Sequence, residues 1–362
     1  MRCQAVEALN PRAARGMTDV RQMRNSPRSI RKAFAWIMRL LVLGLLALTG
    51  VKYLTGMPGQ SHTGPLPPLG EVEEELAANI RAHVTALAED IGPRTVMAGR
   101  HPALLEAERY IGGKLRAFGY ETRRQTFEVA GKEVANVEAV LPGRGEEGII
   151  VVGAHYDTVS MSPGADDNAS AVGVLLELAR MARQLGPYAR EVRFVAFTNE
   201  EPPFFMTSDM GSRRYAAECR KKREDLDAVI VLESIGYYDP RPGSQRYPAP
   251  LSALYPDTGD FIAFVGNLGS LNLTRKLAGL FRENAAFPSY GGSLPGWISG
   301  VSLSDHWAFW REGYDAVMVT DTAMFRNPHY HTPGDTAETL DYDRTARVAA
   351  GLMRVVEEVA GE

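Results

Sequence analysis

The sequence predicts an α/β fold with three layers, in which helices flank a central, mostly parallel, mixed β-sheet. Two observations predict this fold. Short apolar runs, of the kind found in strands buried on both faces, alternate with helical segments along the chain. Polar residues of metal-binding type follow three of these runs directly, as expected where a site lies beyond the carboxyl ends of parallel strands.

The folded part is expected to begin with two helices and a β-hairpin. Residues 71–87 carry acidic side chains in the first turn of an expected helix, and residues 103–118 form a second helical segment. Residues 121–129 and 132–141 alternate between apolar and polar side chains around Ala130-Gly131, which predicts two strands joined by a turn.

The rest of the chain alternates between expected strands and helices. Buried strands are expected at residues 148–153, 192–197, 228–232, 261–265 and 316–320. Helices are expected at residues 170–185, 208–222, 271–284 and 342–359. This alternation is the pattern of a parallel sheet that is covered on both faces.

Composition excludes several classes of protein. The chain has 362 residues, of which 45% are hydrophobic and 23% are charged, as in ordinary globular proteins. The net charge of −4 gives no support for nucleic-acid binding. Cys3 and Cys219 are the only cysteines, so neither a disulfide framework nor a cysteine-based zinc site is expected.

The N-terminal region has a different character. Residues 1–33 form a basic tail, and residues 34–54 contain an apolar run that is interrupted only by Arg39. This arrangement predicts a signal-anchor or transmembrane segment, with the folded part of the chain outside the cytoplasm or exported. Residues 55–69 are rich in Pro and Gly and are expected to be a linker to a folded domain at residues 70–362.

Five motifs carry the chemistry. The segments are Gly153-Ala-His-Tyr-Asp157, Pro163-Gly-Ala-Asp-Asp-Asn-Ala-Ser170, Asn199-Glu-Glu201, Leu232-Glu-Ser-Ile-Gly236 and Tyr330-His-Thr-Pro-Gly-Asp-Thr336. Together they supply imidazoles and carboxylates in a number that suits two zinc ions sharing a bridging carboxylate. A lone buried Glu233 at a strand end would be costly, and a metal partner explains it.

These motifs, in this order, resemble those of the M28 family of zinc peptidases, which includes bacterial leucyl-type aminopeptidases. The resemblance covers roughly residues 70–360 and implies the zinc-dependent exopeptidase fold with a pair of zinc ions. It implies that peptides are cleaved at the N-terminal residue, by metal-activated water and a glutamate general base. The ligands implied are His155, Asp167, Glu201, Glu233 and His331.

The resemblance also assigns two residues that are not ligands. Glu200 is implied as the general base, and Asp157 as the residue that orients His155. Asp166 is expected to be structural, because adjacent carboxylates cannot easily face one metal pair. His329 is the rival of His331, and His306 is expected to be structural rather than a ligand.

Departures from the family leave some roles open. Glu233 stands where the well-known aminopeptidases often have Asp, and no Tyr precedes Ser304-Asp-His306 at the spacing where those enzymes stabilise the oxyanion. One rival interpretation is a single-zinc glutaminyl-cyclase-like aminoacyltransferase, and another is a non-catalytic binding ectodomain. A preference for the C-terminal residue of a peptide also stays open.

Overall fold

The computed structural model describes residues 27–361, so most of the expected basic tail lies outside the described residues. The chain divides into two compact units, Met1–Val51 and Lys52–Glu362. The second unit contains the whole β-sheet and all the residues of the five motifs.

Helix α1, Pro27–Thr55, contains the apolar run. Its part from Phe34 to Thr55 has a mean hydropathy of 2.1 and is unburied. By length and composition this part is apolar enough to cross a membrane, a property that it shares with signal sequences. The helix therefore has the length and composition of a signal-anchor or of a signal peptide.

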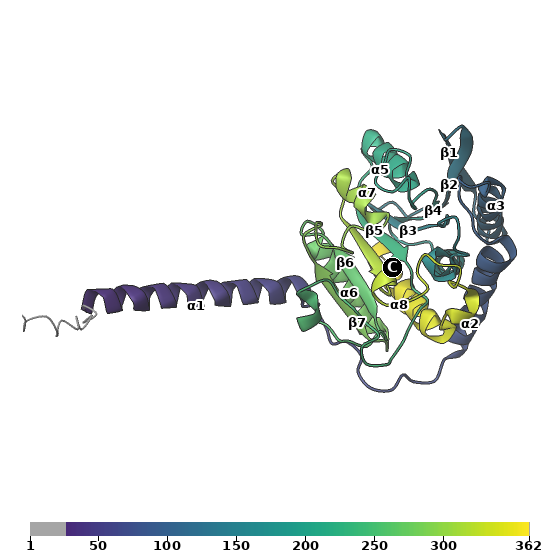
Figure 1. The fold of residues 1–362 in the computed structure, drawn as a ribbon. Helices are drawn as coiled ribbons and strands as arrows, with labels where there is room; N and C mark the ends of the chain where they lie inside the picture. Colours follow the sequence, from purple (N-terminus) through teal and green to yellow (C-terminus); the bar gives the residue numbers. More distant parts are fainter. Residues whose placement is uncertain (1–26, 362) are drawn as a thin grey trace, which may run out of the picture. The chain divides into compact units, whose positions relative to one another are not determined.

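The second unit is built on one eight-stranded mixed sheet (Figure 1). Its strands are β1 Thr122–Val129, β2 Lys132–Leu141, β3 Ile149–His155, β4 Glu191–Phe197, β5 Leu226–Glu233, β6 Ile262–Gly266, β7 Ser289–Ser293 and β8 Ala316–Thr320. Their order across the sheet is β1-β2-β4-β3-β5-β8-β6-β7. The central strands β4, β3, β5 and β8 are parallel, so their carboxyl ends meet at one edge. This confirms the predicted fold class.

Helices cover both faces of the central strands. They are α2 Glu71–Val84, α3 His101–Ala117, α4 Ala171–Leu185, α5 Gly211–Lys222, α6 Leu271–Asn284, α7 His306–Arg311 and α8 Tyr342–Ala360. Shorter helical turns are Thr85–Ile91, Ala165–Ser170, Leu251–Ala253, Ala323–Phe325 and Ala337–Thr339. Helices α2, α4, α6 and α8 pack on one face, and α5 and α7 pack together on the other.

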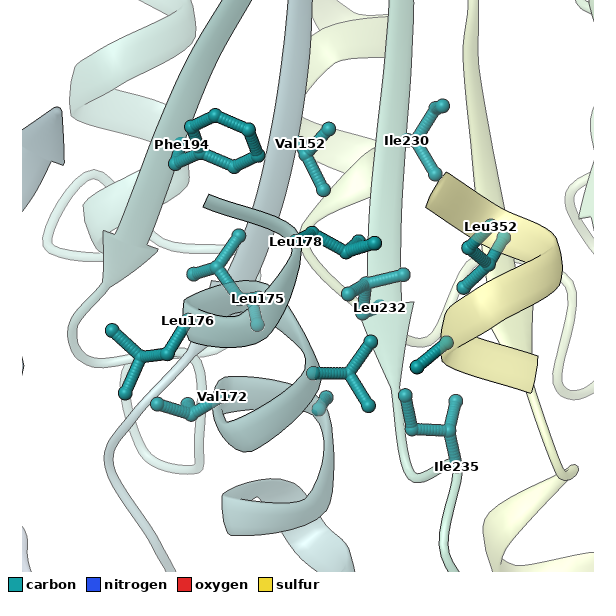
Figure 2. Close-up of a cluster of buried hydrophobic side chains, with 14 of the residues drawn as sticks. Val152, Val172, Leu175, Leu176, Leu178, Phe194, Ile230, Leu232, Ile235 and Leu352 are labelled. Carbon is teal, nitrogen blue, oxygen red and sulfur yellow. The ribbon is translucent and has the colours of Figure 1, made fainter. Parts of the chain in front are cut away.

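Side chains alternate between the two faces along each central strand. Val152 and Ile230 join the large apolar core under α4 and α8, where Figure 2 shows them close to Leu178 and Leu352. Val151 and Val229 point to the other face and join a smaller apolar cluster with α5 and α7. Since both faces of these strands are buried, their sequences are continuous apolar runs rather than alternating ones.

Most of the expected linker packs against the second unit. Met57 is buried in the large core, and Leu66 packs partly against it. Arg282 of α6 donates hydrogen bonds to the backbone carbonyls of residues 57–59, and Arg347 of α8 donates one to the carbonyl of Pro67. The start of the domain at residue 70 stays a prediction, and these contacts place residues 56–67 with the folded unit.

We expect a truncated chain that begins at Lys52 to be more stable than one that begins at Gly70. The shorter chain loses the buried Met57 side chain, which costs roughly 2–5 kcal/mol for a buried methionine. Urea unfolding of the two truncated chains measures this difference. Equal free energies of unfolding would show that residues 52–69 contribute nothing to the fold.

Candidate metal centre

The motif residues lie at or just beyond the carboxyl ends of three parallel strands. His155 is the last residue of β3, Glu233 is the last residue of β5, and Glu200 and Glu201 follow the end of β4 after two intervening residues. Because these strands are parallel neighbours, their ends bring the side chains together. Asp167 lies in the short helical turn Ala165–Ser170 that precedes α4.

The chain turns sharply beside these side chains. Asn199, Ser234 and His331 adopt left-handed backbone conformations, with φ of 57°, 42° and 59°. Residues other than glycine adopt such conformations rarely, and they cluster at functional sites. Here they lie immediately before Glu200, immediately after Glu233 and at His331 itself.

Five side chains form two sets that share Asp167. In each set the potential ligand atoms lie within 4.8 Å of one another, and the sets are His155, Asp167 and Glu233, and Asp167, Glu201 and His331. His155 Nε2 lies 3.2 Å from Asp167 Oδ1, whereas His331 Nε2 lies 3.0 Å from Asp167 Oδ2. The two oxygens of Asp167 therefore face different imidazoles, which is the arrangement of a bridging carboxylate.

The remaining contacts complete each set. His155 Nε2 is 3.3 Å from Glu233 Oε2, and His331 Nε2 is 3.2 Å from Glu201 Oε2. Yet His155 Nε2, His331 Nε2, Asp167 Oδ1 and Glu201 Oε1 are buried and have no hydrogen-bond partner. Buried polar atoms are rarely left without partners. Imidazole nitrogen and carboxylate oxygen are ligands for zinc, so the side chains fit a bound zinc at each set.

The site holds excess negative charge. Burial raises the pKa of Glu201 to about 7 and that of Asp335 to about 8, with neighbouring carboxylates adding to the shift. The pKa of Glu200 is raised well above its usual value by burial and by Glu233 and Glu201. Contacts with Asp167 and Glu201 outweigh burial and raise the pKa of His331 to about 10. A divalent cation would relieve this excess.

Asp157 supports the loop that carries the two glutamates. Its Oδ1 and Oδ2 accept hydrogen bonds from the backbone N–H groups of Glu200 at 3.0 Å and Glu201 at 3.1 Å. His155 Nδ1 lies 3.2 Å from the backbone carbonyl of Asp157 and 3.5 Å from its carboxylate. The carboxylate therefore contacts both the imidazole and the glutamate loop, whereas the sequence indicated only the first contact.

Asp335 and Ser304 also position ligand-type residues, and the sequence did not indicate these contacts. Asp335 accepts hydrogen bonds from the backbone N–H groups of Asp166 at 2.8 Å and Asp167 at 3.2 Å. Ser304 Oγ donates to Glu233 Oε2 at 2.7 Å. Asp335 belongs to one of the five motifs and Ser304 to the Ser304-Asp-His306 segment, but their partners are distant in sequence.

Arg94 is the largest fully buried side chain beside the site. Its guanidinium donates five hydrogen bonds to backbone carbonyls, including those of Tyr156 at 2.7 Å, Pro163 at 2.7 Å and Gly164 at 3.0 Å. Burial lowers its pKa to about 10, so it stays charged at neutral pH. It ties the segment between His155 and Asp157 to the turn before Asp167. An isolated arginine in a loop gave no sequence signal.

The other residues singled out from the sequence lie outside both sets. Asp166 accepts hydrogen bonds from the backbone of Gly236 and the side chain of Asn327, which is a structural tie. His306 is buried, its Nε2 lies 2.8 Å from the carbonyl of Val301, and burial lowers its pKa to about 4. Of the two rival histidines, only His331 belongs to a set among the described residues.

An apolar cavity of about 110 Å³ adjoins Glu233. Its lining includes Tyr247, Tyr255, Phe261 and Tyr330. Among the described residues, the lining contains no Lys, Arg or His, and Glu233 is its only acidic residue. A single water molecule needs roughly 10–15 Å³ of such space, so the cavity is large enough for a bulky side chain.

The fold and the gathered side chains together define an α/β protein with a candidate metal centre beyond the carboxyl ends of its parallel strands, and sequence comparison gives its family. Residues 136–356 match the model of peptidase family M28, so the chain belongs to this family. The chain is 38% identical to the uncharacterized protein YfbL of Escherichia coli, over 81% of this chain and 90% of YfbL. It is 28% identical to aminopeptidase YwaD of Bacillus subtilis, over 64% of this chain and 43% of YwaD.

Solved structures share the fold. BSAP, a zinc aminopeptidase from Bacillus subtilis, has a TM-score of 0.62 and 17% identity, over 79% of this chain and 95% of BSAP. A glutaminyl cyclase from Bacteroides thetaiotaomicron has a TM-score of 0.59 and 18% identity, over 81% of this chain and 99% of the cyclase. At these identities the likeness concerns the fold alone.

We expect Asp157→Asn to lower zinc affinity or kcat/KM by about 10–100-fold, as is usual when a residue that orients ligands is lost. The amide leaves one backbone N–H of the glutamate loop facing another N–H donor. Zinc titration and steady-state kinetics measure the effect. The control is Asp209→Asn, since Asp209 forms an exposed ion pair with Arg214. Equal behaviour of both variants would contradict the assigned contact.

Proposed function

We propose that the chain is a zinc-dependent aminopeptidase that removes N-terminal residues from peptides. One observation carries this proposal: two sets of ligand-type side chains share Asp167 beside an apolar cavity that has no basic residue in its described lining. Family membership supports the hydrolase class, and the relative YwaD is named an aminopeptidase.

We propose that two zinc ions bind, one to each set. His155 and Glu233 would hold the first ion, Glu201 and His331 the second, and Asp167 would bridge them. When bound, zinc supplies Lewis-acid polarisation of a carbonyl and lowers the pKa of a coordinated water. Glutamate in place of aspartate at position 233 is compatible with this set, because Ser304 holds its Oε2.

Glu200 is the proposed general base. It belongs to neither set, its Oε2 lies 3.9 Å from His155 Nε2, and Asp157 fixes its backbone. Burial raises its pKa well above the usual value, and this favours a carboxyl group that accepts a proton and later returns it to the leaving amine.

The lining of the cavity favours the N-terminal end of a peptide. A C-terminal carboxylate needs a cation such as arginine to pair with, whereas a free α-amine does not. No such cation lines the cavity among the described residues. The apolar cavity then receives the side chain of the residue that is released.

Tyr330 is the proposed donor to the oxygen of the scissile carbonyl. It lines the cavity, and its ring stacks on that of His331 with centroids 3.9 Å apart. Burial and four surrounding carboxylates raise its pKa, so its hydroxyl stays protonated and able to donate. This residue takes the place of the tyrosine that the sequence lacks before Ser304.

The experiment that tests this function is hydrolysis of aminoacyl peptides with free and acetylated N-termini. We expect turnover of the free-amine peptides only, about two zinc ions per active chain by elemental analysis, and loss of activity with a chelator that added zinc reverses. Cleavage of acetylated peptides from the C-terminal end would contradict the aminopeptidase assignment. Lack of turnover of every peptide would contradict the proposal that the chain is an enzyme.

We expect Glu200→Gln and Glu201→Gln to fail in different ways. Glutamine at 200 removes a proton acceptor, so kcat should fall about 100- to 10,000-fold while zinc content is kept. Glutamine at 201 weakens a ligand, so zinc occupancy should fall toward one ion per chain. Kinetics and elemental analysis of both variants measure this. Equal loss of zinc in both would reverse or remove the assigned roles.

A glutaminyl-cyclase-like aminoacyltransferase is the second candidate, because a solved cyclase shares the fold. It would use a single zinc ion, whereas both sets are complete here. Cyclisation of an N-terminal glutamine peptide, with one zinc ion per active chain, would favour it.

We propose that the apolar helix α1 anchors the chain in a membrane with the catalytic unit outside the cytoplasm. The basic residues before the helix and its mean hydropathy of 2.1 support this topology. Removal of the segment as a signal peptide is the alternative. Membrane fractionation of the intact chain, with N-terminal sequencing, separates the two.

A further inference from the structure

A short segment after α1, residues 56–61, lies along α6 and the edge strand β7, and we call it the strap. Arg282 of α6 holds it by hydrogen bonds to the carbonyls of Met57 at 2.8 Å, Pro58 at 3.1 Å and Gly59 at 3.3 Å. The same guanidinium donates to the carbonyl of Ser289, the first residue of β7, at 2.8 Å. Arg282 thus joins the strap to the strand.

A second contact joins the strap directly to the start of β7. The hydroxyl of Ser61 accepts a hydrogen bond from the backbone N–H of Ser289 at 2.8 Å. The strand is at the edge of the sheet and pairs only with β6. Edge strands lack partners on one side, so contacts such as these decide where the strand lies.

The side chain of Met57 packs against Gly291, the middle residue of β7. A Cβ atom at Gly291 would lie 2.9 Å from Met57 Cγ, 3.0 Å from Met57 Sδ and 2.9 Å from the backbone oxygen of Phe264, so glycine leaves room for both the Met57 side chain and the neighbouring strand. Met57 is 8% exposed and belongs to the large apolar core. The strap therefore supports β7 from its core-facing side.

The opposite side of β7 forms a wall of the cavity beside Glu233. A Cβ atom at Gly292 would lie 2.7 Å from the hydroxyl of Tyr255, and that hydroxyl donates to the carbonyl of Gly291 at 2.9 Å. Tyr255 stacks on Tyr247, and both line the cavity with Gly291 and Gly292. Two adjacent glycines thus carry the strap on one side and the aromatic wall on the other.

We propose that the strap determines substrate specificity: Met57, held behind Gly291, fixes the β7 wall of the cavity and so favours a bulky apolar N-terminal residue in the substrate. This inference rests on the proposed aminopeptidase function. Without Met57, β7 relaxes toward the vacated space, the carbonyl of Gly291 moves away from Tyr255, and the wall no longer contacts the substrate side chain.

The readout is a ratio that general loss of stability leaves unchanged. A destabilised enzyme loses active molecules equally for every substrate, so the ratio of kcat/KM for N-terminal Phe or Leu to that for Ala stays constant. Loss of the wall lowers kcat/KM for the bulky residues and leaves that for Ala nearly unchanged. This difference separates positioning from stability.

The test compares Met57→Ala with Met353→Ala in the full-length chain. Met353 is a buried core methionine on α8 that does not line the cavity. Both variants should lower the unfolding temperature, but only Met57→Ala should lower the Phe/Ala and Leu/Ala ratios, by roughly tenfold, the worth of about one methylene contact in an apolar pocket. The milder Met57→Val should lower the ratios by less. Met57→Leu, which has a side chain of similar volume, should keep the wild-type ratios.

Three outcomes overturn the inference. Ratios unchanged in Met57→Ala, or in Met57→Val if the first variant does not fold, would show that the strap acts on stability alone. An equal change in Met353→Ala would show that the ratio follows general loosening of the core. A wild-type chain that hydrolyses no free-amine peptide would overturn the proposed function as well, so the two failures are distinguishable.

Discussion

The structure depends on burying many carboxylates together, away from water, beyond the carboxyl ends of the central strands. Asp157, Asp167, Glu200, Glu201 and Glu233 are all nearly inaccessible to solvent, and Asp166, Asp305, Asp321 and Asp335 are buried nearby. Buried charges cost free energy unless they are paired or bind metal. Hydrogen bonds from backbone N–H groups stabilise several of them, and Arg94 adds a buried positive charge that acts on Asp157, Asp335, Asp167 and Glu201. The two histidines and zinc would balance the rest.

The same carboxylates fix the backbone around the site. Asp157 accepts a hydrogen bond from the backbone of the loop after β4, and Asp335 accepts one from the turn that carries Asp167. Asp166 joins that turn to the segment after β5 in the same way. Arg94 adds a further long-range tie. Its guanidinium donates hydrogen bonds to the carbonyl of Tyr156, next to His155, and to those of Pro163 and Gly164, shortly before Asp167. A site held by such long-range bonds is preorganised, because its ligands need little rearrangement to converge on a cation.

Local sequence patterns predicted the parts of this architecture that local physics determines. Strands buried on both faces must be apolar throughout, so β3, β4, β5 and β8 stood out, and their ends located His155 and Glu233. The edge strand β7, Ser-Tyr-Gly-Gly-Ser, was missed because its glycines accommodate Met57 and Tyr255 instead of forming an apolar run. Arg94, the partners of Asp335 and the docking of residues 56–61 were also missed, since each depends on contacts between segments distant in sequence.

The cavity lies where the third layer of the fold is incomplete. Helices α5 and α7 cover one face of β3, β4, β5 and β8 through Tyr215 and Phe309, but the described apolar cluster on this face includes no residue of β6 or β7. Phe261, Ala263 and Val265, at and along β6, are instead left to line the cavity, together with Tyr247 and Tyr255 from a loop. The space between this loop and the sheet adjoins Glu233. The strap is explained by the same missing helix. Among the described elements, the edge strand β7 has no α-helix on its cavity-facing side, so it needs support on its core-facing side, and Met57 and Arg282 provide that support.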